Sequence, residues 1–135
     1  GFTTVEDATK FVEDSGCDWL SVAVGSVHGA IAANLLDKKK PAAKLDIERI
    51  TELEAALNIP LVLHGGSGIE NDYILRGISA GIAKINVGTE LRQPYERAMR
   101  EKNDVEYARE CVYKRCRELI RDFLRTAGDA DVLAR

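Results

Sequence analysis

Residues 61–68 of this chain read Leu61-Val62-Leu63-His64-Gly65-Gly66-Ser67-Gly68. The apolar run at 61–63 is typical of a short buried strand, which ends abruptly at a histidine and a glycine-rich turn. A helical pattern resumes after Ile69. The order strand, glycine loop, helix gathers backbone N–H groups around one point, which is an arrangement that binds anions.

Two further stretches repeat this arrangement on either side. The upstream one is Val22-Ala23-Val24-Gly25-Ser26-Val27-His28-Gly29, and the downstream one is Ile85-Asn86-Val87-Gly88-Thr89-Glu90. Each is an apolar segment that ends in small and polar residues. Because parallel strands end at the same edge of a sheet, the three stretches together predict a site at that edge.

Helical and strand patterns alternate along the whole chain. The predicted helices follow a capping box at Thr3–Glu6, an N-cap at Asp46, the acidic first turn at Glu70, an N-cap at Thr89 and the Asn103-Asp104 break. The last two helices are expected at 90–102 and 105–125, and the predicted strands are 18–24, 61–63 and 82–87, with a long loop at 29–44. The apolar faces expected in the second and third helices comprise Ile47, Ile50, Leu53 and Leu57, and Ile74, Leu75 and Ile78.

This alternation predicts an α/β fold with parallel strands and right-handed crossovers. Three strands are too few to close a barrel, since a (β/α)₈ barrel takes about 250 residues. At 135 residues, without a linker, the chain is one domain or part of a larger one. The pattern therefore leaves two architectures open, about half of a TIM barrel or a small open sheet.

Charge and composition exclude several classes of function. The formal net charge is −3, and the one dense basic run, Lys38–Lys40, is too short for a nucleic-acid footprint. No apolar stretch reaches the ~20 residues of a membrane span, and no signal-peptide pattern is present at the N-terminus. An odd number of cysteines without paired spacing predicts structural thiols in a reduced, cytoplasmic protein; they are Cys17, Cys111 and Cys116.

His28 and His64 are the only histidines, and each follows an apolar segment and precedes a glycine. Imidazoles from neighbouring strand ends can bind one Zn²⁺, although a catalytic zinc needs at least three protein ligands. The alternative is two unrelated loop histidines that are hydrogen-bonded locally, and spacing alone does not choose between them. The glycine-rich loops at 65–68 and 86–89 predict phosphate binding, against the alternative of ordinary turns.

Together, the three strand ends resemble the class II, metal-dependent fructose-bisphosphate and tagatose-bisphosphate aldolases. The resemblance runs from Phe2 to about Leu133 and corresponds to the C-terminal half of the family's TIM barrel, strands six to eight with their helices. It implies that residues 1–135 are the C-terminal half of a single TIM-barrel domain. It also implies reversible, zinc-dependent retro-aldol cleavage of fructose or tagatose 1,6-bisphosphate to dihydroxyacetone phosphate and glyceraldehyde 3-phosphate, as in carbohydrate metabolism and glycolysis.

The resemblance also assigns roles to individual residues. His28 and His64 match two of the three histidines that bind the zinc ion, and a monovalent cation such as Na⁺ or K⁺ binds nearby in some members. The residues that match substrate contacts are Gly29, Gly65, Gly66, Ser67, Asn86, Val87, Gly88 and Thr89. Arg109 is a weaker match to an arginine that meets the second phosphate in a neighbouring subunit, so a homo-oligomer is expected.

The first histidine ligand and the acid–base aspartate of the family have no counterpart in this chain, so no catalytic residue is assigned within it. We expect a companion segment to supply them, as a separate or nicked chain or as residues outside this numbering. Gly88 stands where tagatose-type members carry a small residue, which favours that group slightly. The alternative function is a non-catalytic, phosphate-binding partner subunit of an aldolase complex.

Overall fold

The computed structural model describes residues 1–26, 43–66 and 68–133. It divides into two compact units, Gly1–Val87 and Gly88–Arg135. Within the described residues, no helix combines the length and the apolar character that crossing a bilayer requires.

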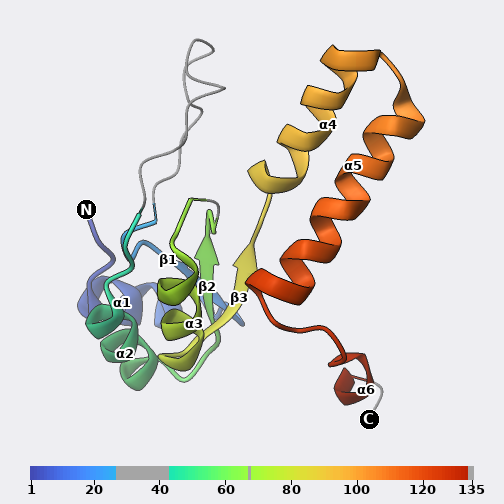
Figure 1. The fold of residues 1–135 in the computed structure, drawn as a ribbon. Helices are drawn as coiled ribbons and strands as arrows, with labels where there is room; N and C mark the ends of the chain where they lie inside the picture. The colour runs from blue at the N-terminus through green and yellow to red at the C-terminus, as the bar shows by residue number, and fades with distance from the viewer. Residues whose placement is uncertain (27–42, 67, 134–135) are drawn as a thin grey trace. The chain divides into compact units, whose positions relative to one another are not determined.

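In its described residues, the first unit is a three-stranded parallel sheet with three helices (Figure 1). The elements follow the chain as α1 (Val5–Ser15), β1 (Leu20–Val22), α2 (Ile47–Ala56), β2 (Leu61–His64), α3 (Asn71–Ser79) and β3 (Ile82–Asn86). The strand order is β1-β2-β3, and both pairings are parallel. The predicted α/β alternation and parallel sheet are therefore confirmed, although β1 is shorter than the predicted strand at 18–24.

The register of the strands determines which side chains share a face. Ser21 aligns with Val62, and a shift between Leu61 and Val62 then aligns Val62 with Lys84 and His64 with Asn86. Because alternate residues of a strand point to opposite faces, the side chains of Ser21, Val62, His64, Lys84 and Asn86 lie on one face of the sheet.

The opposite face carries the core of this unit. A Cβ added to Gly77 of α3 would contact the side chains of Leu45, Ile50 and Ile82 at 3.0–3.8 Å, so α3 packs closely over α2 and β3. The fully buried side chains include Val24, Ile50, Leu53, Leu61, Leu63 and Ile74. The predicted inward positions of α2 and Ile74 are confirmed in large part, whereas Ile78, expected on the apolar face of α3, is 41% exposed.

The cap predicted for the first helix was wrong by a residue. Thr4 caps α1, with its hydroxyl accepting from the Asp7 amide and donating to the Asp7 carboxylate. The Thr3 hydroxyl instead accepts from the Ala23 amide at 2.8 Å, and the Thr3 amide donates to the Ala23 carbonyl at 2.9 Å. Thr3 therefore ties the N-terminus to the segment after β1, a long-range contact that competes with the local capping box. The predicted cap at Asp46 is confirmed.

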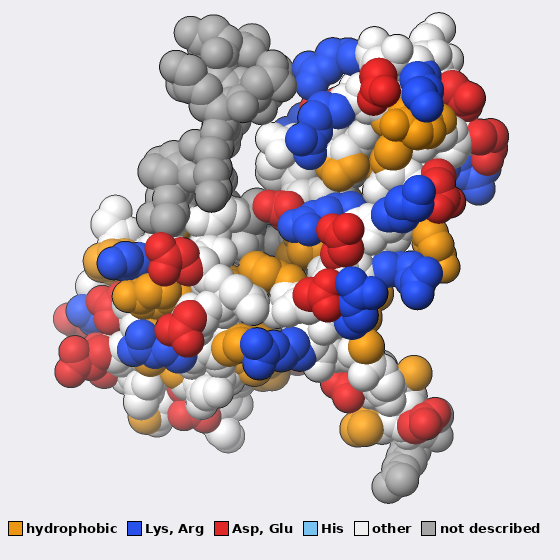
Figure 2. Space-filling view, in the orientation of Figure 1, with side chains coloured by type: hydrophobic (Ala, Val, Ile, Leu, Met, Phe, Trp, Pro, Cys, Tyr) orange, Lys and Arg blue, Asp and Glu red, His pale blue; other side chains and the backbone are white. Residues whose placement is uncertain are grey.

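The second unit is a helical hairpin of α4 (Thr89–Lys102) and α5 (Val105–Glu118), followed by a π-helical turn η2 (Leu119–Phe123) and α6 (Ala130–Leu133). Asn103, in a left-handed conformation, ends α4, and Asp104 caps α5 by accepting from the Glu106 and Tyr107 amides. The helix predicted through 125 thus changes to π geometry after 118. Figure 2 shows Lys and Arg side chains interspersed with Asp and Glu over this unit.

Candidate functional site

His64 and Asn86 lie opposite each other at the carboxyl ends of β2 and β3. Adjacent strands are about 4.8 Å apart, so the two side chains leave the same face of the sheet as close neighbours. The His64 side chain is exposed there, on the face opposite the packed side chains of the core. An imidazole beside a carboxamide at this edge offers one nitrogen donor to a metal and one amide to a polar substrate.

Backbone hydrogen bonds hold the loop after β2 to the segments on either side of it. The Gly66 amide donates to the carbonyl of Asn86 at 3.2 Å, and the Ala43 amide donates to the carbonyl of Gly68 at 3.0 Å. Gly65 and Gly68 have φ angles of 79° and 85°, a left-handed conformation that glycine adopts without strain. The glycines therefore let the loop turn sharply against the end of β3.

Gly66 also has a packing requirement of its own. A Cβ at this position would lie 2.7 Å from Cγ2 of Ile85, so any larger residue would force the loop away from β3. The Gly66 amide already donates to the Asn86 carbonyl, so in this structure Gly66 holds the loop against β3. The phosphate contact predicted for its backbone stays a prediction.

The segment after β1 is held in a similar way. The Asp46 amide donates to the Val24 carbonyl at 2.9 Å, and Gly25, with a φ of 104°, packs so closely that a Cβ would meet the Lys44 carbonyl oxygen at 2.4 Å. The Ser26 hydroxyl is buried and has no hydrogen-bond partner in the described part of the chain. Three predicted site residues, His28, Gly29 and Ser67, lie outside the described residues.

The N-terminus of α3 carries negative charge. Glu70 is its N-cap residue and makes no side-chain cap hydrogen bond, and Asp72 lies in the first turn. These carboxylates interact favourably with the helix dipole and oppose an anion at the same end. Any phosphate bound by the glycine loop would therefore be held by the loop backbone rather than by this helix terminus.

The second unit begins with the other predicted phosphate residues. Gly88 precedes Thr89, which is the first residue of α4 and not its cap as predicted. The amides of Leu91 and Arg92 both donate to the Gly88 carbonyl, which leaves the Thr89 and Glu90 amides outside the helical ladder. The prediction placed the cap one residue late because a glycine, without a capping side chain, begins this helix.

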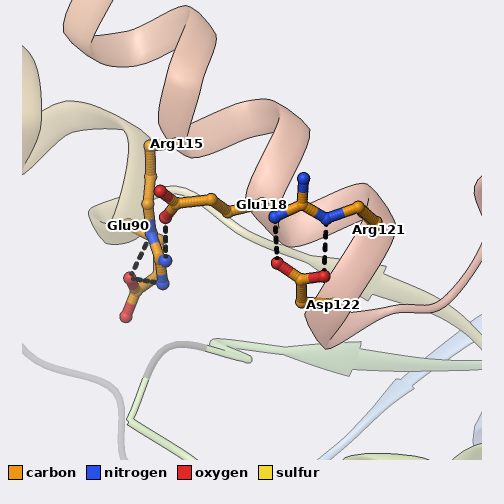
Figure 3. Close-up of polar contacts among 5 residues, drawn as sticks. All are labelled: Glu90, Arg115, Glu118, Arg121 and Asp122. Carbon is orange, nitrogen blue, oxygen red and sulfur yellow. Dashed lines mark hydrogen bonds and ion pairs between the residues drawn. The ribbon is translucent and has the colours of Figure 1, made fainter.

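An ion-pair cluster joins the first turn of α4 to the end of α5 (Figure 3). Arg115 donates to Glu90 from Nη2 at 2.7 Å and Nε at 3.2 Å, and to Glu118 from Nη1 at 2.9 Å. Burial alone would lower the pKa of Arg115, but the hydrogen bonds that it donates to Glu118 and Glu90 outweigh burial and raise that pKa above its ordinary value. The arginine is therefore charged at every working pH.

Two residues near the predicted site, Arg115 and Lys84, were not singled out from the sequence. Nothing in the sequence points to Arg115, because its partner Glu90 is 25 positions away in the chain. Lys84 could have been found, because it lies two residues before Asn86 and therefore shares a strand face with it. By contrast, Arg109, matched only weakly to a phosphate-binding arginine, pairs with Glu106 on its own helix at 2.8 Å and is exposed.

The predicted zinc ligands lie only partly within the described residues. Among residues 1–26, 43–66 and 68–133, no three His, Cys, Asp or Glu side chains gather as a metal site would require. His64 is the one predicted zinc ligand within that part. The three cysteines are half-buried free thiols, as predicted.

Comparison with known proteins identifies the family. Residues 1–131 match the family model of class-II fructose-bisphosphate aldolase. The YdjI aldolase from Escherichia coli K12 is 38% identical, with a TM-score of 0.75, over 90% of this chain and 46% of its own. A putative fructose-1,6-bisphosphate aldolase from Coccidioides immitis is 28% identical, with a TM-score of 0.80, over 97% of this chain and 46% of its own.

A third structure supports the fold alone. The fructose-bisphosphate aldolase of Campylobacter jejuni is 21% identical, with a TM-score of 0.67, over 92% of this chain and 45% of its own. The chain thus spans a little under half the length of these solved structures. Its parallel sheet and helices are part of a TIM barrel, as the family resemblance predicted, and not the small open sheet that the sequence pattern had left open. The chain belongs to the class II fructose-bisphosphate aldolase family.

Proposed function

We propose that this chain is part of a zinc-dependent ketose-bisphosphate aldolase. The reaction is the reversible cleavage of fructose or tagatose 1,6-bisphosphate to dihydroxyacetone phosphate and glyceraldehyde 3-phosphate. The observation that carries the proposal is the in-register pair of His64 and Asn86 at the carboxyl edge of the sheet, in a chain that matches the aldolase family model. The carboxyl ends of barrel strands are where TIM-barrel enzymes build their active sites.

The donor chemistry at this edge fits a zinc site. His64 presents an imidazole from a rigid strand end, and His28, which lies outside the described residues, is proposed as a second ligand. When bound, zinc would act as a Lewis acid and would stabilise the negative charge that develops on the three-carbon fragment as the C3–C4 bond of the ketose breaks. A third ligand and the acid–base aspartate are proposed to come from residues outside this sequence.

The remaining site residues are proposed to hold the substrate. The Asn86 side chain would lie near a substrate hydroxyl, and the backbone of Val87 would continue the same substrate-binding segment. These contacts would hold the three-carbon unit so that the reacting bond lies beside the charged groups. Such positioning lowers the barrier to the reaction. The proposed phosphate contacts are Gly29, Gly65, Gly66, Ser67, Gly88 and Thr89.

The wider setting is proposed on the same basis. The substrate phosphates carry negative charge that the site must neutralise. We therefore propose that a monovalent cation such as Na⁺ or K⁺ binds beside the zinc. A companion segment would complete the barrel, and the assembled protein would be a cytoplasmic homo-oligomer. Gly88, a small residue at the start of α4, favours the tagatose group over the fructose group slightly.

The test measures activity and zinc content in the same samples. The assembled protein, with its companion segment, is assayed with fructose and tagatose 1,6-bisphosphates, with and without a chelator, and compared with His64→Ala and with the surface control Lys10→Ala. We expect His64→Ala to lose bound zinc and at least about a hundred-fold in activity, since even outer-shell changes cost 10- to 100-fold. Lys10 pairs only with Asp14, at 3.7 Å, and its variant should behave as wild type. Full activity of His64→Ala would contradict the proposal, and phosphate binding without zinc would favour a non-catalytic partner subunit.

A further inference from the structure

Lys84 contacts Asn86 directly on the exposed face of β3. Its ammonium donates to Oδ1 of Asn86 at 2.8 Å, and the two residues are separated by one position, so their side chains leave the same face of the strand. Lys84 aligns with Val62 of β2, just as Asn86 aligns with His64. The contact is therefore made within the candidate site, beside the predicted zinc ligand.

The chemistry of the two groups fixes the direction of the amide. An ammonium carries three donors and no acceptor, so only the oxygen of the Asn86 carboxamide can face it. The Nδ2 group is then turned away from Lys84, with its two N–H donors directed elsewhere. A charged donor also polarises the carboxamide, which makes these N–H groups better donors than those of an isolated asparagine.

A second contact holds the ammonium in place. The Lys84 Nζ atom lies 5.6 Å from the centroid of the Trp19 ring, within the range of a cation–π interaction. Trp19 precedes β1, so this contact passes over β2, the central strand. Val62, the β2 partner of Lys84, is only 7% exposed although it lies on the face opposite the packed side chains of the core. Lys84 thus contacts Trp19 on one side and Asn86 on the other, and the three side chains form a row across one face of the sheet.

We propose that Lys84 is a positioning residue that fixes the Asn86 carboxamide with Nδ2 as the donor toward the substrate. The inference rests on the proposed function, which places Asn86 at the ketose bisphosphate. It adds the polarity of the contact: Asn86 recognises an oxygen that accepts hydrogen bonds, and Lys84 selects that state by occupying Oδ1. Without Lys84, the amide can rotate by half a turn and present an acceptor instead.

The first test does not depend on activity. The protein is labelled with ¹⁵N-asparagine, and the side-chain amide signal of Asn86 is assigned by its disappearance in Asn86→Ala. We expect the signal to shift or broaden in Lys84→Met and to stay near its wild-type position in Lys84→Arg, which keeps a charged donor. Lys102→Met is the matched control, because Lys102 also stacks on an aromatic ring, that of Tyr107 at 3.7 Å, but belongs to the other unit. An unchanged Asn86 signal in Lys84→Met would overturn the proposal.

The second test is a double-mutant cycle on kcat and KM. Loss of a charged hydrogen bond predicts a fall in kcat/KM of about ten- to a hundred-fold for Lys84→Met, with partial recovery in Lys84→Arg. If Lys84 acts through Asn86, the same substitution costs little in an Asn86→Ala background. An equal cost in both backgrounds would assign Lys84 a merely structural role and overturn the proposal. If the wild type cleaves no ketose bisphosphate, the proposed function fails, and the amide signal still decides the role of Lys84.

Discussion

Arg115 of α5 donates two hydrogen bonds to one carboxylate oxygen of Glu90 in the first turn of α4. Both side chains are 34% exposed, and the guanidinium also reaches Glu118. Figure 3 shows these three side chains gathered together, apart from the neighbouring pair of Arg121 and Asp122. The cluster ties the start of α4 to a residue distant in sequence, so it bears directly on the residues that open this helix.

Replacing Arg115 by Met tests the strength of that link. We expect a loss of about 0.5–1.5 kcal/mol in the free energy of unfolding, measured in urea, because the pairs are partly screened by solvent. The control is Arg109→Met, which removes one exposed pair with Glu106 and should cost no more than about 0.5 kcal/mol. Equal losses in the two variants would show that the Glu90 contact adds nothing to ordinary surface pairing.

Replacing Gly66 by Ala tests the packing of the loop on β3. The added Cβ would lie 2.7 Å from Cγ2 of Ile85, a branched side chain that cannot move aside freely. We expect a destabilisation of about 1–3 kcal/mol by thermal or urea unfolding. Adding Ile85→Leu, which removes Cγ2, should restore part of the loss. No loss in the single variant, or no recovery in the double, would mean that the close approach is not maintained in solution.

Gly88 offers the opposite kind of substitution. A Cβ here meets nothing within 4 Å, and the φ of −121° lies outside the left-handed region that favours glycine. We expect Gly88→Ala to stabilise the protein by about 0.4–1 kcal/mol, through the lower entropy of the unfolded chain. Gly88→Asp should add about 0.3–1 kcal/mol more through the dipole of α4, and high salt should remove that addition. A destabilised Ala variant would contradict this account of the helix start.

Tyr107 gives a pH-dependent prediction. The nearby Glu101 carboxylate, followed by Cys111, raises the pKa of its phenol above the ordinary 10.0. The folded chain therefore holds this proton more tightly than the unfolded chain, so the contribution to stability is complete below pH 10 and is lost as the pH rises through the folded value. Absorbance titration of the phenolate, compared between wild type and Tyr107→Phe, should place Tyr107 above pH 10. Glu101→Gln should bring it back toward that value.

The order of elements and the sheet edge could be predicted from the sequence because both depend on local patterns. Leu61–Leu63 and the apolar positions of α2 repeat at strand and helix periods, and the polar residues that follow the strands mark their ends. A parallel sheet then brings His64 and Asn86 to one edge whatever the details of the loops.

Most differences from the prediction arise from contacts between residues that lie far apart in the sequence, and the start of α4 is the exception. Thr3 gives up the capping role because Ala23 binds it, and Thr89 is displaced as a cap because the helix begins at a glycine. The pairing of Arg115 with Glu90 depends on how α5 folds back on α4. The exposure of Ile78 likewise follows from the packing of α3 on its neighbours, which its own periodicity does not specify.

The irregularity between Leu61 and Val62 has a consequence for the chemistry of the sheet edge. In an uninterrupted ladder that starts from Leu61 and Ile82, His64 would stand opposite Ile85. The additional residue in β3 advances the strand by one position, so that a carboxamide takes the place of an aliphatic chain beside the imidazole. The side chain beside the imidazole is thus set by the register: pairing without the shift would bring Ile85 there, whereas removing Ala83, the additional residue, would straighten the ladder and leave Asn86 opposite His64.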